Sequence, residues 1–386
     1  MIHPERPLRR VCFLALPLFS AVAHAGYQFE DGDLKGELTL LGGAAVIDSH
    51  NANFGLGRVD LRTGEVGKQN NSWQEYYVKP GLTLEYKVNP DFSVLAGGSF
   101  VASSTQGDGD PGGYTRAGDG SSAIEEAFTG FRAGDWKLTA GRQNYTVGNG
   151  FIVMDGNLDS FGEGDYWSGP RTAFRDSAIL GWQHEGISAQ AFSLRTDDHL
   201  GDVRMSGANL DYTVPGTATL GAMAFKVKSL DDDLNQVVAR DGMQVYNLRA
   251  LNVKVPGATA LTLNGEYAIE RGSGKGVTYD ADAWYLGGDY SFDSLPMQPV
   301  FGYRYASFSG DSDLSDNKQK SWDPLSKGFT EWGTWLIGDV VGNYLLYNSN
   351  EDVHTWRLKG HVTDTVTAGA LYYQFSLNEK IISDRQ

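Results

Sequence analysis

Two acidic runs are the parts of this sequence whose residue types and spacing come nearest to a chemical site. Both lie in segments that we predict to be loops: Asp231-Asp232-Asp233, and the cluster Asp311, Asp313 and Asp316. Carboxylate oxygens are the ligands that Ca²⁺ prefers, so divalent cations are candidate partners of these loops. The spacing D-x-D-x-x-D lacks the glycine and terminal glutamate of an EF-hand loop, which favours solvated surface charge instead.

Catalytic and cofactor-binding motifs are absent from the sequence. It contains no G-x-S-x-G, no H-E-x-x-H and no phosphate-binding loop. Four histidines stand in separate segments, so we expect no metal centre; they are His184, His199, His354 and His361. We therefore expect a protein that is not an enzyme and carries no cofactor. A barrel hydrolase is the alternative, but no pair of neighbouring segments offers a Ser/His/Asp set.

The first 25 residues have the pattern of a secretory signal peptide. The pattern consists of Arg6, Arg9 and Arg10, an apolar run from Val11 to Val22, and Ala23-His24-Ala25. It predicts cleavage after Ala25, and the run is too short for a membrane-spanning helix. The adjacent Arg9 and Arg10 leave a twin-arginine export signal as the alternative. The only cysteine, Cys12, lies in this segment, so residues 26–386 contain no thiol.

The charge balance excludes one class of partner. The chain has 32 Lys and Arg against 48 Asp and Glu, a net charge of −16, and removing the predicted signal peptide leaves about −18. A protein that binds nucleic acid needs a basic face, so we expect none as a partner. Mean hydropathy is −0.34, which a polar-lined barrel and a water-soluble β-protein would share.

A rhythm of alternating segments dominates the chain from about Trp73 onward. Segments of roughly ten residues come in pairs joined by a tight turn, and longer Gly/Asp-rich stretches separate the pairs. The tight turns are Asn89-Pro90-Asp91, Ala133-Gly134-Asp135, Glu185-Gly186, Val214-Pro215-Gly216, Val255-Pro256-Gly257 and Asp364-Thr365. Short turns that alternate with long loops are typical of outer-membrane β-barrels, whose periplasmic turns are short.

The rhythm predicts an all-β, antiparallel, up-and-down transmembrane barrel of about 16 strands, with 18 as the alternative. We read fifteen strands, near 34–46, 73–88, 92–104, 122–132, 136–146, 176–184, 187–195, 203–212, 217–227, 243–254, 258–270, 280–292, 299–309, 353–363 and 366–377. Bacterial barrels have even strand numbers, and the polar residues after Glu379 do not form a closing strand. We therefore predict one barrel over 26–386 that lacks its C-terminal closing strand. A large water-soluble β-protein is the alternative.

Two stretches resemble the alginate-export family of outer-membrane porins. The first runs from Glu125 to Arg132, turns, and continues from Trp136 to Tyr145 with a G-R-Q sequence; the second contains Trp322-Asp323-Pro324-Leu325 and Trp332-Gly333-Thr334-Trp335. The resemblance implies a monomeric barrel of 16 to 18 strands that passes a uronate polymer or a smaller solute. It also implies that Arg142 faces the lumen, whereas strict alternation places Arg142 beside Leu138 and Ala140. A local bulge or a position near the rim of the barrel would reconcile the two, because a charge on the lipid face is costly.

Alternation assigns most other charged strand residues to the inner face. Together with Arg142, the predicted pore-lining residues are Arg249, Glu266, Asp289, Arg304, Arg357 and Lys359. An exporter of polyanions is expected to have an Arg-rich lumen, and this set is mixed in sign. Pairing of each arginine with a carboxylate inside the barrel is the alternative to a role in selectivity.

Two long segments are candidates for loops that narrow the pore. Residues Val147–Arg175 are rich in glycine and carry Arg171 and Arg175. Residues 310–352 contain many apolar side chains, among them Trp322, Trp332 and Trp335, which would not stay in water. We predict that this second segment folds back into the mouth of the barrel as a partly helical lid; a further strand pair is the alternative.

These observations favour a porin-like channel in the bacterial outer membrane for an anionic or saccharide-type small solute. Export of an anionic polysaccharide such as alginate is the alternative function. The expected partners are outer-membrane lipid and lipopolysaccharide, besides the solute itself. A dense set of inward arginines would favour export, and a mixed Arg/Glu constriction would favour uptake.

Overall fold

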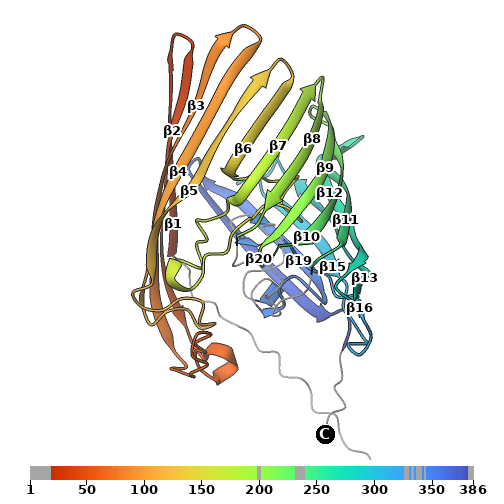
Figure 1. Ribbon diagram of the computed structural model, residues 1–386. Coiled ribbons are helices and arrows are strands. Elements are labelled where there is room, and N and C mark those ends of the chain that lie inside the picture. Colours follow the sequence, from red (N-terminus) through yellow and green to blue (C-terminus); the bar gives the residue numbers. More distant parts are fainter. Residues whose placement is uncertain are drawn as a thin grey trace, which may run out of the picture.

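The computed structural model describes residues 19–197, 201–230, 240–325, 330–331, 334–335, 341–342 and 345–380. Within these residues the chain forms one 18-stranded sheet and a separate two-stranded sheet. The large sheet curves round into the wall of a barrel, with loops folded inside it (Figure 1). Among the described residues, no helix is long and apolar enough to cross a membrane.

Sixteen strands form the wall, and each pairs antiparallel with its neighbours in the chain. They are β1 (Phe19–Asp31), β2 (Leu34–Ser49), β3 (Asn71–Asn89), β4 (Phe92–Gly107), β5 (Gly120–Ala133), β6 (Trp136–Gln143), β7 (Phe174–His184), β8 (Ile187–Arg195), β9 (Val203–Val214), β10 (Ala218–Ser229), β11 (Met243–Val255), β12 (Ala258–Gly274), β14 (Ala281–Ser291), β15 (Val300–Phe308), β19 (Glu351–Thr363) and β20 (Val366–Leu377). The short elements are η1 (Ala52–Gly55), η2 (Phe161–Glu163), β13 (Val277–Tyr279), β16 (Lys318–Gln319), β17 (Thr330–Glu331) and β18 (Thr334–Trp335). The predicted all-β antiparallel barrel of about 16 strands is therefore confirmed.

The connections differ at the two ends of the wall, as the rhythm of the sequence predicts. Tight turns such as Gly134-Asp135 and Glu185-Gly186 lie at one end, here called the short-turn end. Gly134 and Gly186 have φ of 54° and 84°, a conformation that glycine adopts without the steric cost of a side chain. The long connections gather at the opposite, long-loop end (Figure 1).

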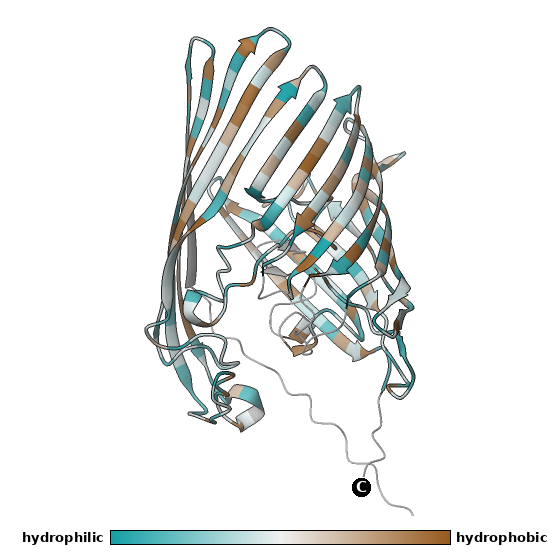
Figure 2. Ribbon diagram, viewed as in Figure 1, coloured by the Kyte–Doolittle hydropathy of each residue, from teal (hydrophilic) through white to brown (hydrophobic). Residues whose placement is uncertain are grey.

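Alternate residues of each strand face opposite sides of the wall. In β12, Glu266, Ala268 and Glu270 are buried inside, whereas Tyr267 between them is exposed on the outer face. The hydropathy alternates along the strands accordingly (Figure 2). Such a wall buries its polar face and presents a continuous apolar belt, which is the arrangement of a barrel in lipid.

Strand β1 was not predicted from the sequence. Its first seven residues, Phe19 to Ala25, coincide with the end of the predicted signal peptide, whose composition hides the alternation. Within the described residues β1 pairs only with β2, and β20 pairs only with β19. β1 is therefore the sixteenth strand of the wall. Cleavage of the chain after Ala25 and the absence of a C-terminal closing strand stay predictions.

The apolar belt gives a first testable prediction. Leu286, at the middle of β14, is 59% exposed on the outer face, and Leu56, in the loop after β2, is 74% exposed. Replacing Leu286 by arginine puts a charge in the belt and is expected to cost about 2–4 kcal/mol of folding free energy. Leu56→Arg should cost almost nothing, because Leu56 lies outside the belt.

Urea titrations of folding into lipid vesicles measure both changes. Equal free energies of unfolding for the two variants would contradict the assignment of the outer face.

Candidate functional site

The connection between β6 and β7, residues 144–173, is here called the inward loop. It leaves one side of the wall and reaches the opposite side. There the Asn149 side chain donates a hydrogen bond of 2.8 Å to the Tyr285 hydroxyl on β14. Phe151 meets the Tyr285 ring edge-on at 5.2 Å between centroids. The inward loop therefore crosses the lumen, as predicted for Val147–Arg175.

The other end of the inward loop is fixed to β3 and β5. The Lys79 ammonium group on β3 donates a hydrogen bond of 2.9 Å to the carbonyl oxygen of Pro170. The Glu125 carboxylate on β5 accepts hydrogen bonds from the backbone N–H groups of Thr172 and Ala173, at 2.7 and 2.8 Å. Lys79 and Glu125 are 3.6 Å apart and both buried, so the contact is a desolvated ion pair.

Arg171 attaches the inward loop to β4 and β5. Its side chain is only 2% exposed and forms an ion pair of 2.5 Å with Asp159, another residue of the loop. The same guanidinium donates hydrogen bonds to the hydroxyls of Ser103 on β4, at 3.1 Å, and Ser121 on β5, at 2.7 Å. Burial raises the pKa of Asp159, and Arg171 partly offsets this. The structure thus places Arg171 in the attachment of the loop, away from the open lumen.

Apolar packing adds to these polar contacts near the long-loop end. Phe151 of the inward loop stacks on Trp322 at 6.4 Å between ring centroids. The buried cluster around them draws on the loop and on the inner faces of β8 to β19; its large members include Ile152, Phe192, Met205, Met243 and Phe308. The barrel therefore has a hydrophobic core of its own, which holds the inward loop in one position.

Four predicted pore-lining residues are buried on the inner wall: Arg249, Glu266, Arg304 and Arg357. Their positions follow the alternation, but the inward loop covers part of this wall. A Cβ atom added to Gly148 of the loop would lie 3.0 Å from the Arg249 side chain. Backbone and arginine thus approach closely there, and glycine is the residue that leaves room.

Charges on this wall form pairs that reach across one intervening strand. Arg249 on β11 binds Asp211 on β9, with nitrogen–oxygen distances of 3.0 and 2.5 Å. Arg357 on β19 binds Asp289 on β14, at 2.8 and 3.0 Å. The predicted alternative, arginine paired with carboxylate inside the barrel, describes both contacts. Asp211 was not among the predicted residues, although alternation along β9 places it on the same inner face as Asn209.

Glu266 and Arg304 meet at Tyr285, a residue that the sequence did not single out. Glu266 accepts hydrogen bonds from the Tyr285 hydroxyl, at 3.0 Å, and from the Asn247 side chain, at 3.1 Å. The Arg304 guanidinium lies over the Tyr285 ring, 5.1 Å from its centroid. Tyr285 therefore joins the charged wall to Asn149 of the inward loop.

Arg142 reaches the interior through an irregularity in β6. The register of the β6–β7 pairing shifts between Gly141 and Gln143, and Gly141 has φ of 131°. Arg142 then lies 3.8 Å from Glu125, which is fully buried, and 3.6 Å from Asp197. A bulge of this kind turns a side chain toward the other face, which resolves the conflict between alternation and resemblance.

The remaining predicted residues lie in different places. Lys359 is half-buried on β19, two residues from Arg357 and on the same face. Arg175 is half-buried and belongs to β7, beyond the end of the inward loop. Neither residue belongs to the contact between the inward loop and β14, which Asn149 and Tyr285 form.

Where the structure describes it, the segment between β15 and β19 folds back to the mouth of the barrel, and its role as a partly helical lid stays a prediction. Trp322 is buried, and Asp323 accepts two hydrogen bonds from Arg240 at 2.7 and 2.8 Å. The same segment includes the two-residue strands β17 and β18, which pair with each other but not with the wall. Trp335 ends β18, and its side chain, like the whole of Trp332, lies outside the described residues.

The acidic cluster of Asp311, Asp313 and Asp316 makes its contacts within its own loop. Asp311 accepts hydrogen bonds from the backbone N–H groups of Asp313 and Lys320, and Asp316 forms an ion pair of 3.6 Å with Lys320. In the part of the chain that the structure describes, no three His, Cys, Asp or Glu residues form a group suited to a metal ion. Asp231-Asp232-Asp233 lies outside that part.

A network of hydrogen bonds, which the sequence did not predict, joins two loops at the long-loop end. Arg116, in the loop after β4, binds Asp60, in the loop after β2, through two hydrogen bonds of 2.6 Å. The guanidinium of Arg116 holds the pKa of Asp60 well below its usual range. Tyr114 stacks on Tyr166 of the inward loop at 4.3 Å between centroids, which links this network to the lumen.

A pair of carboxyl groups lies where the inward loop meets β3. Asp165 of the loop is buried, and its carboxyl group lies close to that of Glu75 on β3. Glu75 also accepts a hydrogen bond of 2.8 Å from the backbone N–H of Trp167. Burial raises the pKa of Asp165 to about 7. Two buried carboxyls in contact are most stable when they hold a proton between them.

The strands form an antiparallel β-barrel with a loop folded inside it, and solved structures of outer-membrane proteins share this fold. OmpF of Salmonella typhi in complex with daunomycin is similar with a TM-score of 0.52 and 14% identity, over 92% of this chain and 94% of that one. OccK11 (OpdR) of Pseudomonas aeruginosa is similar with a TM-score of 0.50 and 13% identity, over 89% and 79%. At such low identity the likeness concerns the fold alone.

Sequence comparisons do not assign the chain to a family. No protein-family model matches the chain, and no curated protein matches it. The resemblance to the alginate-export family therefore remains a prediction from two short stretches.

Proposed function

We propose that this protein is an outer-membrane channel through which small anionic or saccharide-type solutes diffuse. The observation that carries the proposal is the inward loop, which is attached to one wall through Arg171 and Glu125 and to the opposite wall through Asn149. A loop fixed at both sides of a barrel narrows the passage without sealing it by strand pairing. Size and charge at that level then decide which solutes pass.

The mixed charges support diffusion of small solutes over export of a polymer. Arg249 and Arg357 are each neutralised by a neighbouring aspartate, at 2.5 and 2.8 Å. Export of a polyanion needs a wide and uniformly basic lumen, whereas paired charges create a transverse field that orients a small polar solute. Hydrogen-bonding side chains such as Asn149 and Tyr285 suit sugars and carboxylates.

Liposome swelling tests the proposal. Vesicles that contain the refolded protein are transferred to iso-osmotic solutions of a monosaccharide, its sugar acid, a trisaccharide or an alginate oligomer. We expect swelling that falls steeply with solute size. Absence of swelling with the smallest sugar, from protein shown to be folded by its heat-modifiable migration, would overturn the proposal. Equal rates for the oligomer and the monosaccharide would favour the polymer exporter.

Arg142 offers a test of charge selectivity. Its side chain is 23% exposed and lies near Asp197, so it contributes an electrostatic field to the water-filled part of the lumen. Arg142→Gln removes one positive charge, and a charge about 8 Å from a passing ion in water contributes roughly 0.5 kcal/mol. We expect a shift of about twofold in the permeability ratio toward cations.

The reversal potential under a KCl gradient measures this ratio, and Arg142→Lys is the matched control that keeps the charge. An unchanged reversal potential in Arg142→Gln would exclude Arg142 from the selectivity of the channel.

A further inference from the structure

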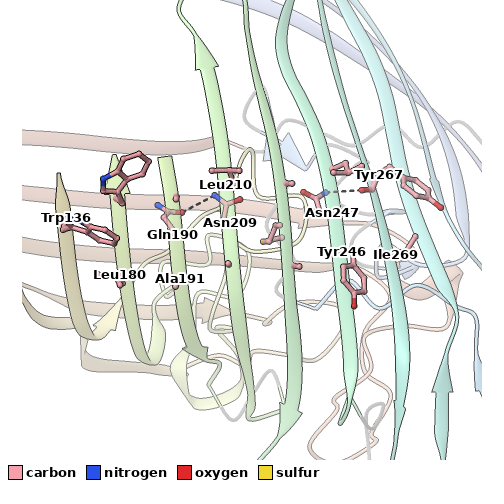
Figure 3. A pocket seen from close by; sticks show the side chains of 17 residues that line it. Trp136, Leu180, Gln190, Ala191, Asn209, Leu210, Tyr246, Asn247, Tyr267 and Ile269 are labelled. Carbon is pink, nitrogen blue, oxygen red and sulfur yellow. Dashed lines mark hydrogen bonds between the residues drawn. The ribbon is translucent and has the colours of Figure 1, made fainter. Parts of the chain in front are cut away.

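The outer face of the wall has a hollow that the channel function does not use. Its volume is about 850 Å³, and it extends over strands β6 to β12 (Figure 3). Its floor is formed by the outward positions of β8, β9 and β10. One row across these strands, Ala191, Ala208 and Ala224, carries only small side chains, and in the next row Ala189 and Ala222 stand on either side of Leu210. A hollow of this size is large enough for a ligand.

Large apolar side chains form the two sides of the hollow. Trp182 and Leu180 stand on β7, and Tyr246 and Leu248 stand on β11. The register shows how abrupt the change in size is: Ala222 pairs with Leu248 in β11. The hollow therefore results from small side chains that lie between large ones on a face that meets lipid.

A basic group borders the hollow on its long-loop side. Lys226 and Lys228 occupy the next two outward positions of β10 after Ala224, and both are exposed. At about 3.4 Å per residue, Lys226 begins roughly 7 Å beyond the alanine floor. Lys228 pairs in register with Arg204 of β9, so two like charges stand side by side, which is unfavourable without an anion.

The charges around this border are only partly neutralised. Arg204 forms an ion pair of 2.8 Å with Asp176. Between the residues that the structure describes, Lys226 and Lys228 form no salt bridge. The chain has a net charge of −16, so a basic patch on its surface is unusual. Lys226 and Lys228 form such a patch, because no described acidic residue neutralises them.

The position along the strand matches the edge of the apolar belt. β10 begins after the turn at Pro215-Gly216, and its outward residues are apolar up to Ala224. A strand crosses the hydrocarbon in about 9–11 residues, so Lys226 and Lys228 lie at the boundary on the long-loop side. In a barrel, this is the side of the outer leaflet.

We propose that the hollow binds the acyl chains of a phosphate-bearing lipid of the outer leaflet, whose headgroup is held by Lys226 and Lys228. Acyl chains fill the space above the alanines, and the two ammonium groups neutralise a phosphate. The charge argues for a lipid over a second copy of the chain, because among the described residues no carboxylate pairs with either lysine and Asp176 is already paired with Arg204. The site depends on the outer-membrane location but not on what the lumen passes.

Native mass spectrometry of the detergent-solubilised protein tests the proposal, with bis-phosphorylated lipid A as the probe. We expect a bound lipid that survives detergent exchange. Lys226→Gln/Lys228→Gln should weaken its affinity about thirtyfold, equivalent to about 2 kcal/mol at roughly 1 kcal/mol per lysine. Ala222→Leu/Ala224→Leu should weaken binding by filling the floor. Lys318→Gln, an exposed lysine over other strands, is the matched control and should bind like the parent.

Other outcomes would overturn the proposal. Equal binding of lipid A that lacks both phosphates would exclude headgroup recognition, and displacement by millimolar inorganic phosphate alone would exclude the acyl site. A dimer or trimer that is lost in the alanine variants would show that the hollow is an interface between copies. Single-channel conductance should be unchanged in all of these variants, so failure of the lipid site and failure of the channel are distinguishable.

Discussion

Replacing Arg171 by alanine is expected to release the inward loop from the wall and to raise the single-channel conductance. The substitution removes the ion pair with Asp159 and the hydrogen bonds to Ser103 and Ser121. It leaves the buried Asp159 carboxylate without its charged partner, a change that costs about 3–5 kcal/mol. A penalty of about 3 kcal/mol shifts the ratio of docked to undocked loop by roughly a hundredfold.

Recordings of Arg171→Ala in planar bilayers should therefore show larger and noisier current steps than those of the parent. Arg204→Ala is the matched control: it also removes an arginine from an ion pair, with Asp176, but on the outer face and partly exposed. Such a pair contributes about 0–1 kcal/mol and lies away from the lumen, so its current steps should equal those of the parent. Identical conductance for Arg171→Ala and the parent would show that the inward loop does not limit the passage.

Docking of the inward loop is also expected to weaken as the pH rises. Burial raises the pKa of Asp165 to about 7, from an ordinary value of 3.8. A carboxyl whose pKa is higher in the docked loop than in the undocked loop binds its proton more tightly when docked. Its contribution is complete below about pH 4 and is lost as the pH rises through about 7.

Hydrogen exchange of residues 144–173, corrected for the intrinsic rate, measures this docking. Linkage to one proton gives at most about a tenfold change per pH unit. We expect protection to fall between pH 5 and pH 8 in the parent and to change much less in Asp165→Asn, which cannot ionise. Asp313→Asn is the control, because Asp313 is exposed in another loop and its pKa is already lowered by hydrogen bonds with Ser315. The same pH dependence in Asp165→Asn and the parent would exclude Asp165 as its source.

The wall of the barrel could be predicted from the sequence because its signals are local. Alternation with a period of two and tight turns such as Glu185-Gly186 are legible within about ten residues of chain. Fifteen of the wall strands follow from them. β1 does not, because residues 19–25 also satisfy the pattern of a signal peptide, and the two patterns overlap in small apolar residues.

The site could be predicted only in part. Alternation places Arg249 and Glu266 on the inner face, but it carries no information about what covers them. The contact of Asn149 with Tyr285 joins residues 136 positions apart, and it depends on the path of a loop across the barrel. Arg142 shows the same limit at a smaller scale, because one residue of bulge at Gly141 changes the face that it occupies.

The prediction of a folded-back segment depended on composition instead of periodicity. Apolar side chains such as Trp322 must leave water wherever the chain runs, so their burial was foreseeable. Their partner was not: Trp322 stacks on Phe151, a residue of a different loop. Contacts between two irregular segments are set by the shape of the whole lumen.

The measurement that tests the central claim most directly is the single-channel conductance of the refolded protein in a planar bilayer. The account predicts discrete current steps that are reproducible between channels, with a size that increases when Arg171 is replaced by alanine. Protein that is folded by its heat-modifiable migration yet gives no steps, either as the parent chain or as Arg171→Ala, would contradict it. In that case the lumen would be sealed, and the inward loop would be a plug instead of a constriction.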